Sequence, residues 1–217
     1  MIDKTQNLPA LAEEYLLALF SRDASYVAAK TNLHVLAHHP VDGLTAGHQA
    51  LTALFTRGPS WLSGTATLEV GTITTEGRRA VVEATVALEQ AGKRIDLPMA
   101  LAVEIEPHGL VSQTRLYHSL KPLYGYHQTR EPILFSASHL ILADPIATYQ
   151  AALAAGDIAK VISAFCADGC VRQPSGKTRE HRGTEGLHRY YSRLLAGGGI
   201  PLQNCTATTE GFRTVVE

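Results

Sequence analysis

The N-terminal third of the chain has an apolar stripe with helical period. Leu8, Leu11, Tyr15 and Leu19 recur at a spacing that predicts an amphipathic helix over residues 8–20, with Tyr15 on its apolar side. A shorter helix is expected over residues 24–30. A third is expected from His48 to Phe55, directly after Gly47.

Beyond residue 65 the spacing of the apolar residues changes from a helical period to a period of two residues. Apolar and polar residues alternate through four runs that are separated by turns at Glu76-Gly77, Ala91-Gly92 and His108-Gly109. The last run covers residues 110–119. Helices followed by an antiparallel meander indicate an α+β fold with the helices on one face of the sheet.

The chain also repeats itself. The segment from Tyr15 to Asp23 matches Tyr149 to Asp157, and Thr75 to Glu83 matches Thr209 to Glu217. Gly47 corresponds to Gly183 after a two-residue insertion. We therefore expect a first domain over residues 1–122, a linker over 123–143 and a second domain over 144–217.

The second copy begins at Asp144-Pro145, where Asp144 is expected to cap the first helix and proline to occupy its first turn. It ends at Glu217, in the middle of a predicted strand, and lacks the strands that follow in the first copy. Two expectations follow: the chain is a fragment of a longer protein, or another molecule covers the open edge, for instance by self-association.

Composition narrows the class of partner. The 217 residues are 45% hydrophobic and carry a net charge of −1, which argues against a nucleic-acid or membrane-surface partner. No apolar run approaches the roughly 20 residues of a membrane span, and the N-terminus does not have the pattern of a signal peptide. An odd number of cysteines favours a reducing, cytoplasmic location, with Cys166 and Cys170 as small buried thiols rather than metal ligands.

Several motifs together resemble one superfamily. They are Tyr149–Asp157, Phe165–Pro174, His181–Gly183, Thr209–Glu217 and Arg115–Ser119. In this order they are similar to the nuclear transport factor 2-like (NTF2-like) superfamily, most closely its SnoaL-like and ketosteroid isomerase-like branch. The resemblance implies two cone-shaped domains, each with helices packed on a curved antiparallel sheet around an apolar pocket, the second domain lacking its last strands. It implies neither a cofactor nor a metal ion.

The resemblance to ketosteroid isomerases carries over only in part. Tyr15 stands at the position of the family's tyrosine that donates a hydrogen bond to the developing oxyanion, and Tyr149 repeats it. The family's catalytic carboxylate precedes a proline; here that position holds His39 in the first copy and Gln173 in the second. The family's second donor, an aspartic acid, maps onto Leu101. The acidic residue of SnoaL-type cyclases maps onto Ser119, which cannot act as acid or base alone.

These correspondences give His39 and Tyr15 as candidate catalytic residues, with His39 titrating near the ordinary histidine pKa of about 6.5. Alternatives remain open at this point: His38 and His39 could be polar groups at a loop mouth, and Tyr15 a structural tyrosine. Metal binding by His38, His39, His48 and His118 is not expected, because nothing fixes a ligand geometry. The candidate ligand-binding residues are Trp61, Leu101, His118, Tyr149 and Gln173.

Three functional hypotheses follow. The first is a pocket protein that binds a small apolar ligand without established catalysis. The second is an isomerase or polyketide cyclase-like enzyme, in which His39 removes a proton alpha to a carbonyl and Tyr15 stabilises the enolate oxygen. The third is a protein–protein adaptor, which would need an exposed apolar patch. The missing second donor weakens the enzyme hypothesis relative to the first.

Overall fold

The computed structural model describes residues 7–59, 66–90, 92–126, 131–174 and 180–217. Its contacts divide the chain into two compact units. Unit 1 comprises Met1–Ile133, Pro174–Gly176 and Thr208–Val215; unit 2 comprises Leu134–Gln173, Lys177–Ala207 and Val216–Glu217. The boundaries expected from the repeat, 1–122, 123–143 and 144–217, stay predictions.

Unit 1 begins with the helices that the sequence predicts. Helix α1 spans Leu8–Ser21 and α2 spans Ala24–Lys30, where the Asp23 carboxylate accepts a hydrogen bond of 2.9 Å from the Tyr26 amide and caps the helix. Helix α3 spans His48–Arg57. It follows Gly47, whose φ of +88° lies in the region that favours glycine.

A six-stranded sheet completes unit 1, in the order β2-β1-β6-β5-β4-β3. Strands β3 (Ala66–Glu76), β4 (Arg79–Gln90), β5 (Lys93–Ile105) and β6 (Val111–His118) form the predicted antiparallel meander. The short helix α4 (Lys121–Tyr124) follows β6. Strands β1 (Thr31–His39) and β2 (Gly43–Ala46), which the sequence pattern does not predict, add to the far side of β6. β1 runs parallel to β6 and antiparallel to β2.

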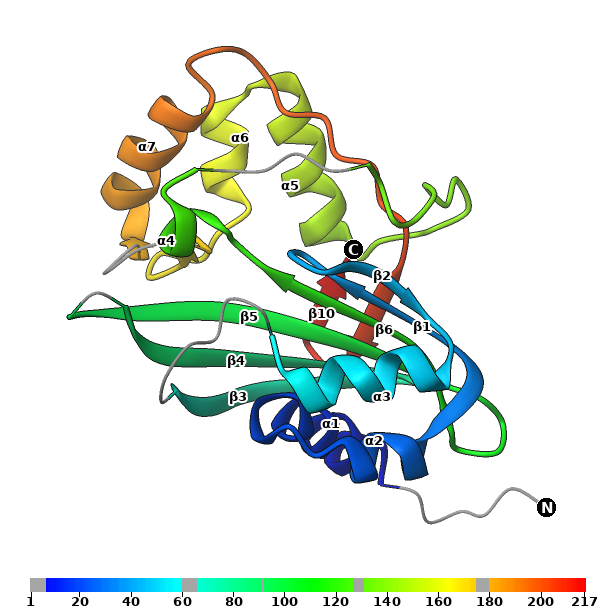
Figure 1. The fold of residues 1–217 in the computed structure, drawn as a ribbon. Helices are drawn as coiled ribbons and strands as arrows, with labels where there is room; N and C mark the ends of the chain where they lie inside the picture. Colours follow the sequence, from blue (N-terminus) through cyan, green and yellow to red (C-terminus); the bar gives the residue numbers. More distant parts are fainter. Residues whose placement is uncertain (1–6, 60–65, 91, 127–130, 175–179) are drawn as a thin grey trace. The chain divides into compact units, whose positions relative to one another are not determined.

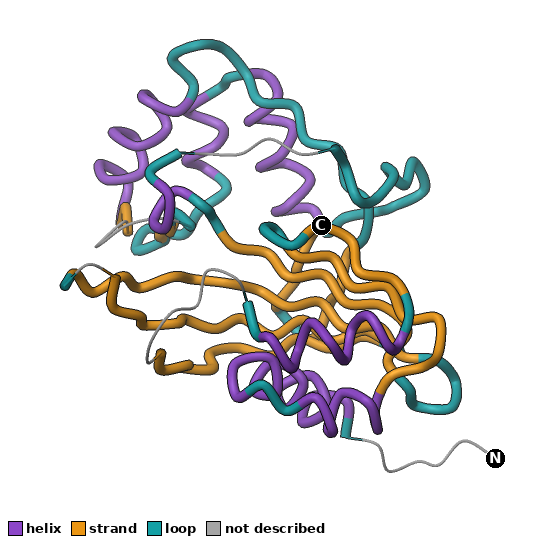
Figure 2. The backbone as a smooth tube through the Cα atoms, in the orientation of Figure 1, coloured by secondary structure: helices purple, strands orange, loops and turns teal. Residues whose placement is uncertain are grey.

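Helices α1, α2 and α3 lie along one face of this sheet, which we call the inner face (Figures 1 and 2). The hydrophobic core of unit 1 lies there. The register places Val82, Leu101 and Leu116 side by side across β4, β5 and β6, and all three are buried. Register shifts in β3 and between β5 and β6 mark bulges, which increase the curvature of a sheet. The α+β class predicted from the periodicity is therefore confirmed.

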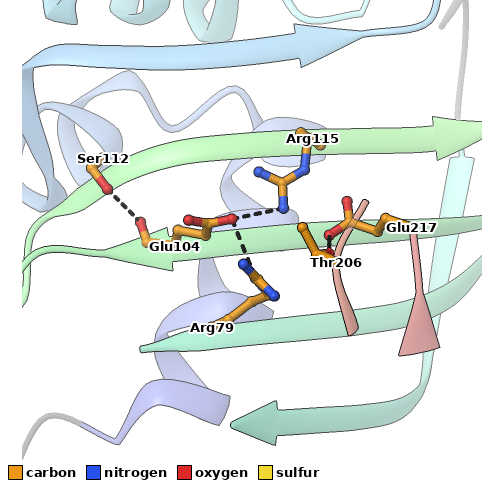
Figure 3. A network of polar contacts seen from close by, with 6 residues as sticks. All are labelled: Arg79, Glu104, Ser112, Arg115, Thr206 and Glu217. Atoms are coloured by element: carbon orange, nitrogen blue, oxygen red, sulfur yellow. Dashed lines mark hydrogen bonds and ion pairs between the residues drawn. The ribbon is translucent and has the colours of Figure 1, made fainter. Parts of the chain in front are cut away.

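The opposite face of the sheet holds a partly buried ion-pair network (Figure 3). Glu104 Oε1 accepts hydrogen bonds from Arg115 Nη2 at 2.8 Å and from Arg79 Nε at 3.2 Å. The side chain of Arg115 is fully buried, whereas those of Glu104 and Arg79 are partly exposed. The Ser112 hydroxyl donates to the backbone carbonyl of Glu104. A separate contact, drawn in the same figure, belongs to unit 2: the Thr206 hydroxyl donates to the Glu217 carboxylate. Its length is 2.8 Å.

The described residues of unit 2 form three helices and a short hairpin. They are α5 (Asp144–Ala155), α6 (Ile158–Ser163), β7 (Cys170–Arg172), β8 (Glu180–Arg182) and α7 (Gly183–Leu194). The β9 (Ala207–Glu210) and β10 (Arg213–Val216) hairpin follows in the chain, and most of its residues group with unit 1. The element order α5 to β10 matches α1 to β4, as a tandem repeat would require.

Two local expectations are wrong. Ala143 rather than Asp144 is the N-cap of α5, so that Asp144 is the first helical residue and makes no capping hydrogen bond. Cys166 is exposed rather than buried, because it lies in the loop between α6 and β7. Within the described part of the chain, no helix is long and apolar enough to cross a membrane.

Candidate functional site

His39 is the last residue of β1 and belongs to the inner face. It shares the buried phase of the strand with Val35 and Ala37, and only 4% of its surface is exposed. Burial lowers the pKa of His39 to about 4, against a smaller raising effect of the Asp42 charge and with further lowering by His118 and His38. His39 is therefore a neutral imidazole at pH 7. It lies at the end of a strand rather than in an open loop.

His118 is the last residue of β6, and it lies near the same end of the two parallel strands as His39. Because β1 and β6 are parallel and Ala37 pairs with Thr114, the level of His39 corresponds to Leu116. His118 lies two residues further, about 7 Å along the strands. Its register partner on β5 is Met99, which faces the core. His118 Nδ1 lies 3.4 Å from the carbonyl oxygen of Ser119.

Asp42 is a functional candidate that the sequence does not reveal. It lies in the turn between β1 and β2, where its Oδ1 accepts a hydrogen bond of 3.2 Å from Arg57 Nη2. Its side chain is only 10% exposed, and Oδ2 is buried without a hydrogen-bond partner among the described residues. The one sequence signal for it is the Pro40-Val-Asp-Gly43 turn, which returns the chain toward the strand end.

Tyr15 faces the sheet from α1. It is 2% exposed, and its ring meets the Phe55 ring edge-on with a centroid distance of 5.2 Å. The hydroxyl is buried and makes no hydrogen bond of good geometry within the described residues. Burial raises the pKa of Tyr15 well above its usual range, although the Thr114 hydroxyl opposes this weakly. Tyr15 therefore stays protonated and available as a donor.

Two side chains of α3 each contact one of these candidates. Phe55 contacts Tyr15, and Arg57, two residues later, pairs with Asp42. We call Tyr15, His39, Asp42 and His118 the inner-face site. It combines a phenol donor, a neutral imidazole and a carboxylate beside an apolar wall that includes Leu101, and such groups can donate, accept or transfer a proton.

The remaining candidates lie elsewhere. Tyr149 and Gln173 belong to unit 2, where the Tyr149 hydroxyl lies 2.9 Å from that of Tyr191 and Gln173 Nε2 lies 3.5 Å from His181 Nε2. The His181 ring stacks on Tyr190 at 4.6 Å. Trp61 lies outside the described residues. No group of three or more histidine, cysteine, aspartate or glutamate side chains suited to a metal ion occurs in the described parts of the chain.

Solved structures that resemble the chain cover about half of it. An LEH-like epoxide hydrolase of M. tuberculosis is 18% identical with a TM-score of 0.44, over 54% of this chain and 86% of that one. An NTF2-like protein from Cytophaga hutchinsonii is 18% identical with a TM-score of 0.43, over 56% and 98%. A protein with a ketosteroid isomerase-like fold from Catenulispora acidiphila, solved with trimethylamine, is 12% identical with a TM-score of 0.47, over 54% and 91%.

At these identities the likeness concerns the fold alone. Proteins described as NTF2-like, ketosteroid isomerase-like and SnoaL-like are among the solved structures that the chain resembles. No family model and no curated protein sequence matches the chain.

Proposed function

We propose that unit 1 binds a small, largely apolar ligand with a polar group that accepts a hydrogen bond from Tyr15. The observation that carries the proposal is the Tyr15 hydroxyl, a buried donor that makes no hydrogen bond of good geometry among the described residues, although the Thr114 hydroxyl lies near it. An unsatisfied buried polar group costs about 1–3 kcal/mol. A ligand carbonyl or hydroxyl oxygen would remove this penalty, and the apolar side chains around Leu101 would contact its carbon skeleton.

A second candidate is proton transfer alpha to a carbonyl. It is favoured by the environment of His39, which burial keeps neutral while the Asp42 carboxylate lies close enough to stabilise its protonated form. In such a reaction His39 would take the proton from carbon, and the Tyr15 hydroxyl would stabilise the enolate oxygen. Leu101 supplies no donor, so the oxyanion would depend on Tyr15 more strongly than in a site with two donors.

The test is conversion of an unconjugated to a conjugated enone by the full chain, measured from pH 5 to pH 8. Because the pKa of His39 is about 4, the rate should be nearly level across this range. His39→Ala should abolish it, and Tyr15→Phe should lower it by about 10²–10³. His108→Ala, at an exposed turn, serves as the control and should leave it unchanged.

The outcomes separate the two candidates. No turnover with retained binding of a saturated ketone would leave the binding proposal standing and reject catalysis on this substrate. A rate that rises with a midpoint near pH 6.5 would contradict a buried neutral base at position 39. Unchanged ketone binding by Tyr15→Phe would contradict both candidates.

A further inference from the structure

Two hydrogen bonds in unit 1 are related to each other by the predicted repeat. The backbone amide of Thr75 donates to Glu210 Oε2 at 2.8 Å, and the backbone amide of Thr209 donates to Glu76 Oε2 at 2.7 Å. The alignment that matches Thr75 with Thr209 also matches Glu76 with Glu210. Each turn therefore gives the other the same two groups that it receives. Such reciprocity is the property of an isologous contact, in which a surface binds a second copy of itself.

The two turns that make this contact have the same local structure. Both have the sequence Thr-Thr-Glu-Gly, which begins at Thr74 between β3 and β4 and at Thr208 between β9 and β10. Their glycines, Gly77 and Gly211, have φ angles of +58° and +60°. Thr74 and Thr208 are each only 1% exposed, although threonine is mostly a surface residue. Two matching threonines are thus buried in two matching hairpins.

The face of the sheet opposite to the helices is buried beside this contact. Thr74 pairs with Val81 on β4, and Val81 is level with Ala102 on β5. Side chains alternate along β4, so these three lie on the other face from Val82, which belongs to the core under the helices. Val81 is 2% exposed and Ala102 1%. The β9–β10 hairpin, whose residues Thr208–Val215 belong to unit 1, hydrogen-bonds to this part of the sheet, and a cover of this kind accounts for the burial.

We propose that Thr74, Thr75, Glu76 and Val81, here named the turn patch, form a self-recognition surface whose partner is a second Thr-Thr-Glu-Gly hairpin. The chain supplies that partner from the second copy of its own repeat. A hairpin without the glutamate would leave the Thr75 amide without its charged acceptor, so the pair of bonds selects for a matching sequence.

Because the contact is isologous, the partner can also come from another copy of the chain. The turn patch of a second chain presents the same amide, carboxylate and buried threonine as the β9–β10 hairpin, and it can occupy the same place once that hairpin is displaced. The turn patch lies on the opposite face of the sheet from the inner-face site. Its test therefore does not depend on the ligand proposed for unit 1.

The reciprocal bonds can be tested one at a time by amide hydrogen exchange, measured by NMR on the full chain. Glu210→Ala should accelerate exchange of the Thr75 amide, and Glu76→Ala that of the Thr209 amide, each by at least about tenfold. Glu69→Ala removes an exposed carboxylate from the same strand as Glu76 and should change neither rate.

Self-recognition between chains is tested by sedimentation velocity. Thr208→Arg puts a long cation at a buried position of the hairpin and should displace it, so that this variant forms a dimer that the wild-type chain does not form at the same concentrations. Adding Thr74→Arg blocks the turn patch and should restore the monomer. Adding Thr67→Arg instead is the matched control, because Thr67 is exposed on the same strand and face, and the dimer should persist.

Two results would overturn the proposal. A Thr208→Arg chain that stays monomeric although exchange of its Thr75 amide is accelerated would show that the exposed turn patch does not recognise a second copy. A dimer that persists after Thr74→Arg is added would place the association on another surface. The glutamate variants change only exposed side chains, so unchanged exchange of both amides in them would refute the reciprocal contact even if the arginine variants failed to fold.

Discussion

The hydroxyl oxygen of Tyr149 lies 2.9 Å from that of Tyr191, so that two tyrosines on α5 and α7 share one hydrogen bond. At the corresponding places of the predicted repeat stand Tyr15 and Phe55, whose rings meet edge-on without a second hydroxyl. In unit 2 the tyrosine on the first helix thus has a hydrogen-bonded partner, whereas the Tyr15 hydroxyl makes no hydrogen bond of good geometry among the described residues of unit 1.

We expect Tyr191→Phe to lower the free energy of unfolding by about 1 kcal/mol, because the Tyr149 hydroxyl loses its partner. Urea unfolding of the two single variants and of Tyr149→Phe with Tyr191→Phe gives the coupling between the hydroxyls. The double variant should lower the free energy of unfolding by less than the sum of the two single variants. Tyr126→Phe, at an exposed position, is the control and should have little effect. Strict additivity would show that the pair contributes nothing.

The buried His39 predicts a dependence of stability on pH. Its pKa is about 4 in the folded chain and about 6.5 when unfolded, so unfolding takes up a proton between these values. The contribution of the neutral His39 side chain to stability is therefore fully present above pH 6.5. It is lost as the pH falls toward 4, because the unfolded chain takes up the proton first. Lowering the pH from 7 to 5 should cost about 2 kcal/mol through His39 alone.

The variant His39→Gln isolates this contribution, because glutamine does not titrate. Glutamine is also the residue of the second copy of the repeat at the corresponding position, Gln173. Urea unfolding at pH 5 and pH 7 should show a smaller loss for the variant than for the wild type. His108→Gln, at an exposed turn, should retain the wild-type loss. The same loss in His39→Gln would mean that other groups cause the pH dependence.

The helices α1, α2 and α3 and the meander β3 to β6 follow from the sequence because their periods are long and regular. The strand β1 does not, since TNLHVLAHH mixes polar and apolar residues without strict alternation. Its antiparallel partner β2 is only four residues long, and its longer partner β6 pairs in parallel and lies about 80 residues away in the chain. The register against β6 also shifts between Thr31 and Leu36. Parallel pairing with a distant strand leaves little local signal.

The candidate site was predictable only in part for a similar reason. His39 and Tyr15 stand at positions that a family resemblance marks, but the low pKa of His39 comes from its burial under the helices, which no local pattern encodes. Asp42 acquires a role only when the turn after His39 places its carboxylate beside Arg57. The low pKa of His39 and the position of the Asp42 carboxylate both arise from tertiary packing.

The ion pair between Glu104 and Arg115 should be a larger contributor to stability than the surface pairs. Arg115 is fully buried, so removing the charge of its partner leaves a cation with less compensation. We expect Glu104→Gln to cost about 2 kcal/mol in urea unfolding, less than for a wholly buried pair because Glu104 is 29% exposed. Asp96→Asn, which breaks the exposed pair with Arg94, should cost less than about 0.5 kcal/mol. Similar costs for the two variants would refute this difference.

The exposed Cys166 should react slowly for a surface thiol. The carboxylate of Asp168 accepts a hydrogen bond from it and adds a negative charge nearby, and both effects raise the pKa of Cys166. Since the thiolate is the nucleophile, a raised pKa lowers the rate of alkylation at neutral pH. With Cys170 and Cys205 replaced by serine, Asp168→Asn should accelerate the reaction with iodoacetamide several-fold at pH 7.5. Glu185→Gln removes an exposed carboxylate that pairs with Arg189 instead, and should leave the rate unchanged. Acceleration in both variants would point to the net charge of the chain rather than to Asp168, and acceleration in neither would mean that the thiol does not contact that carboxylate in solution.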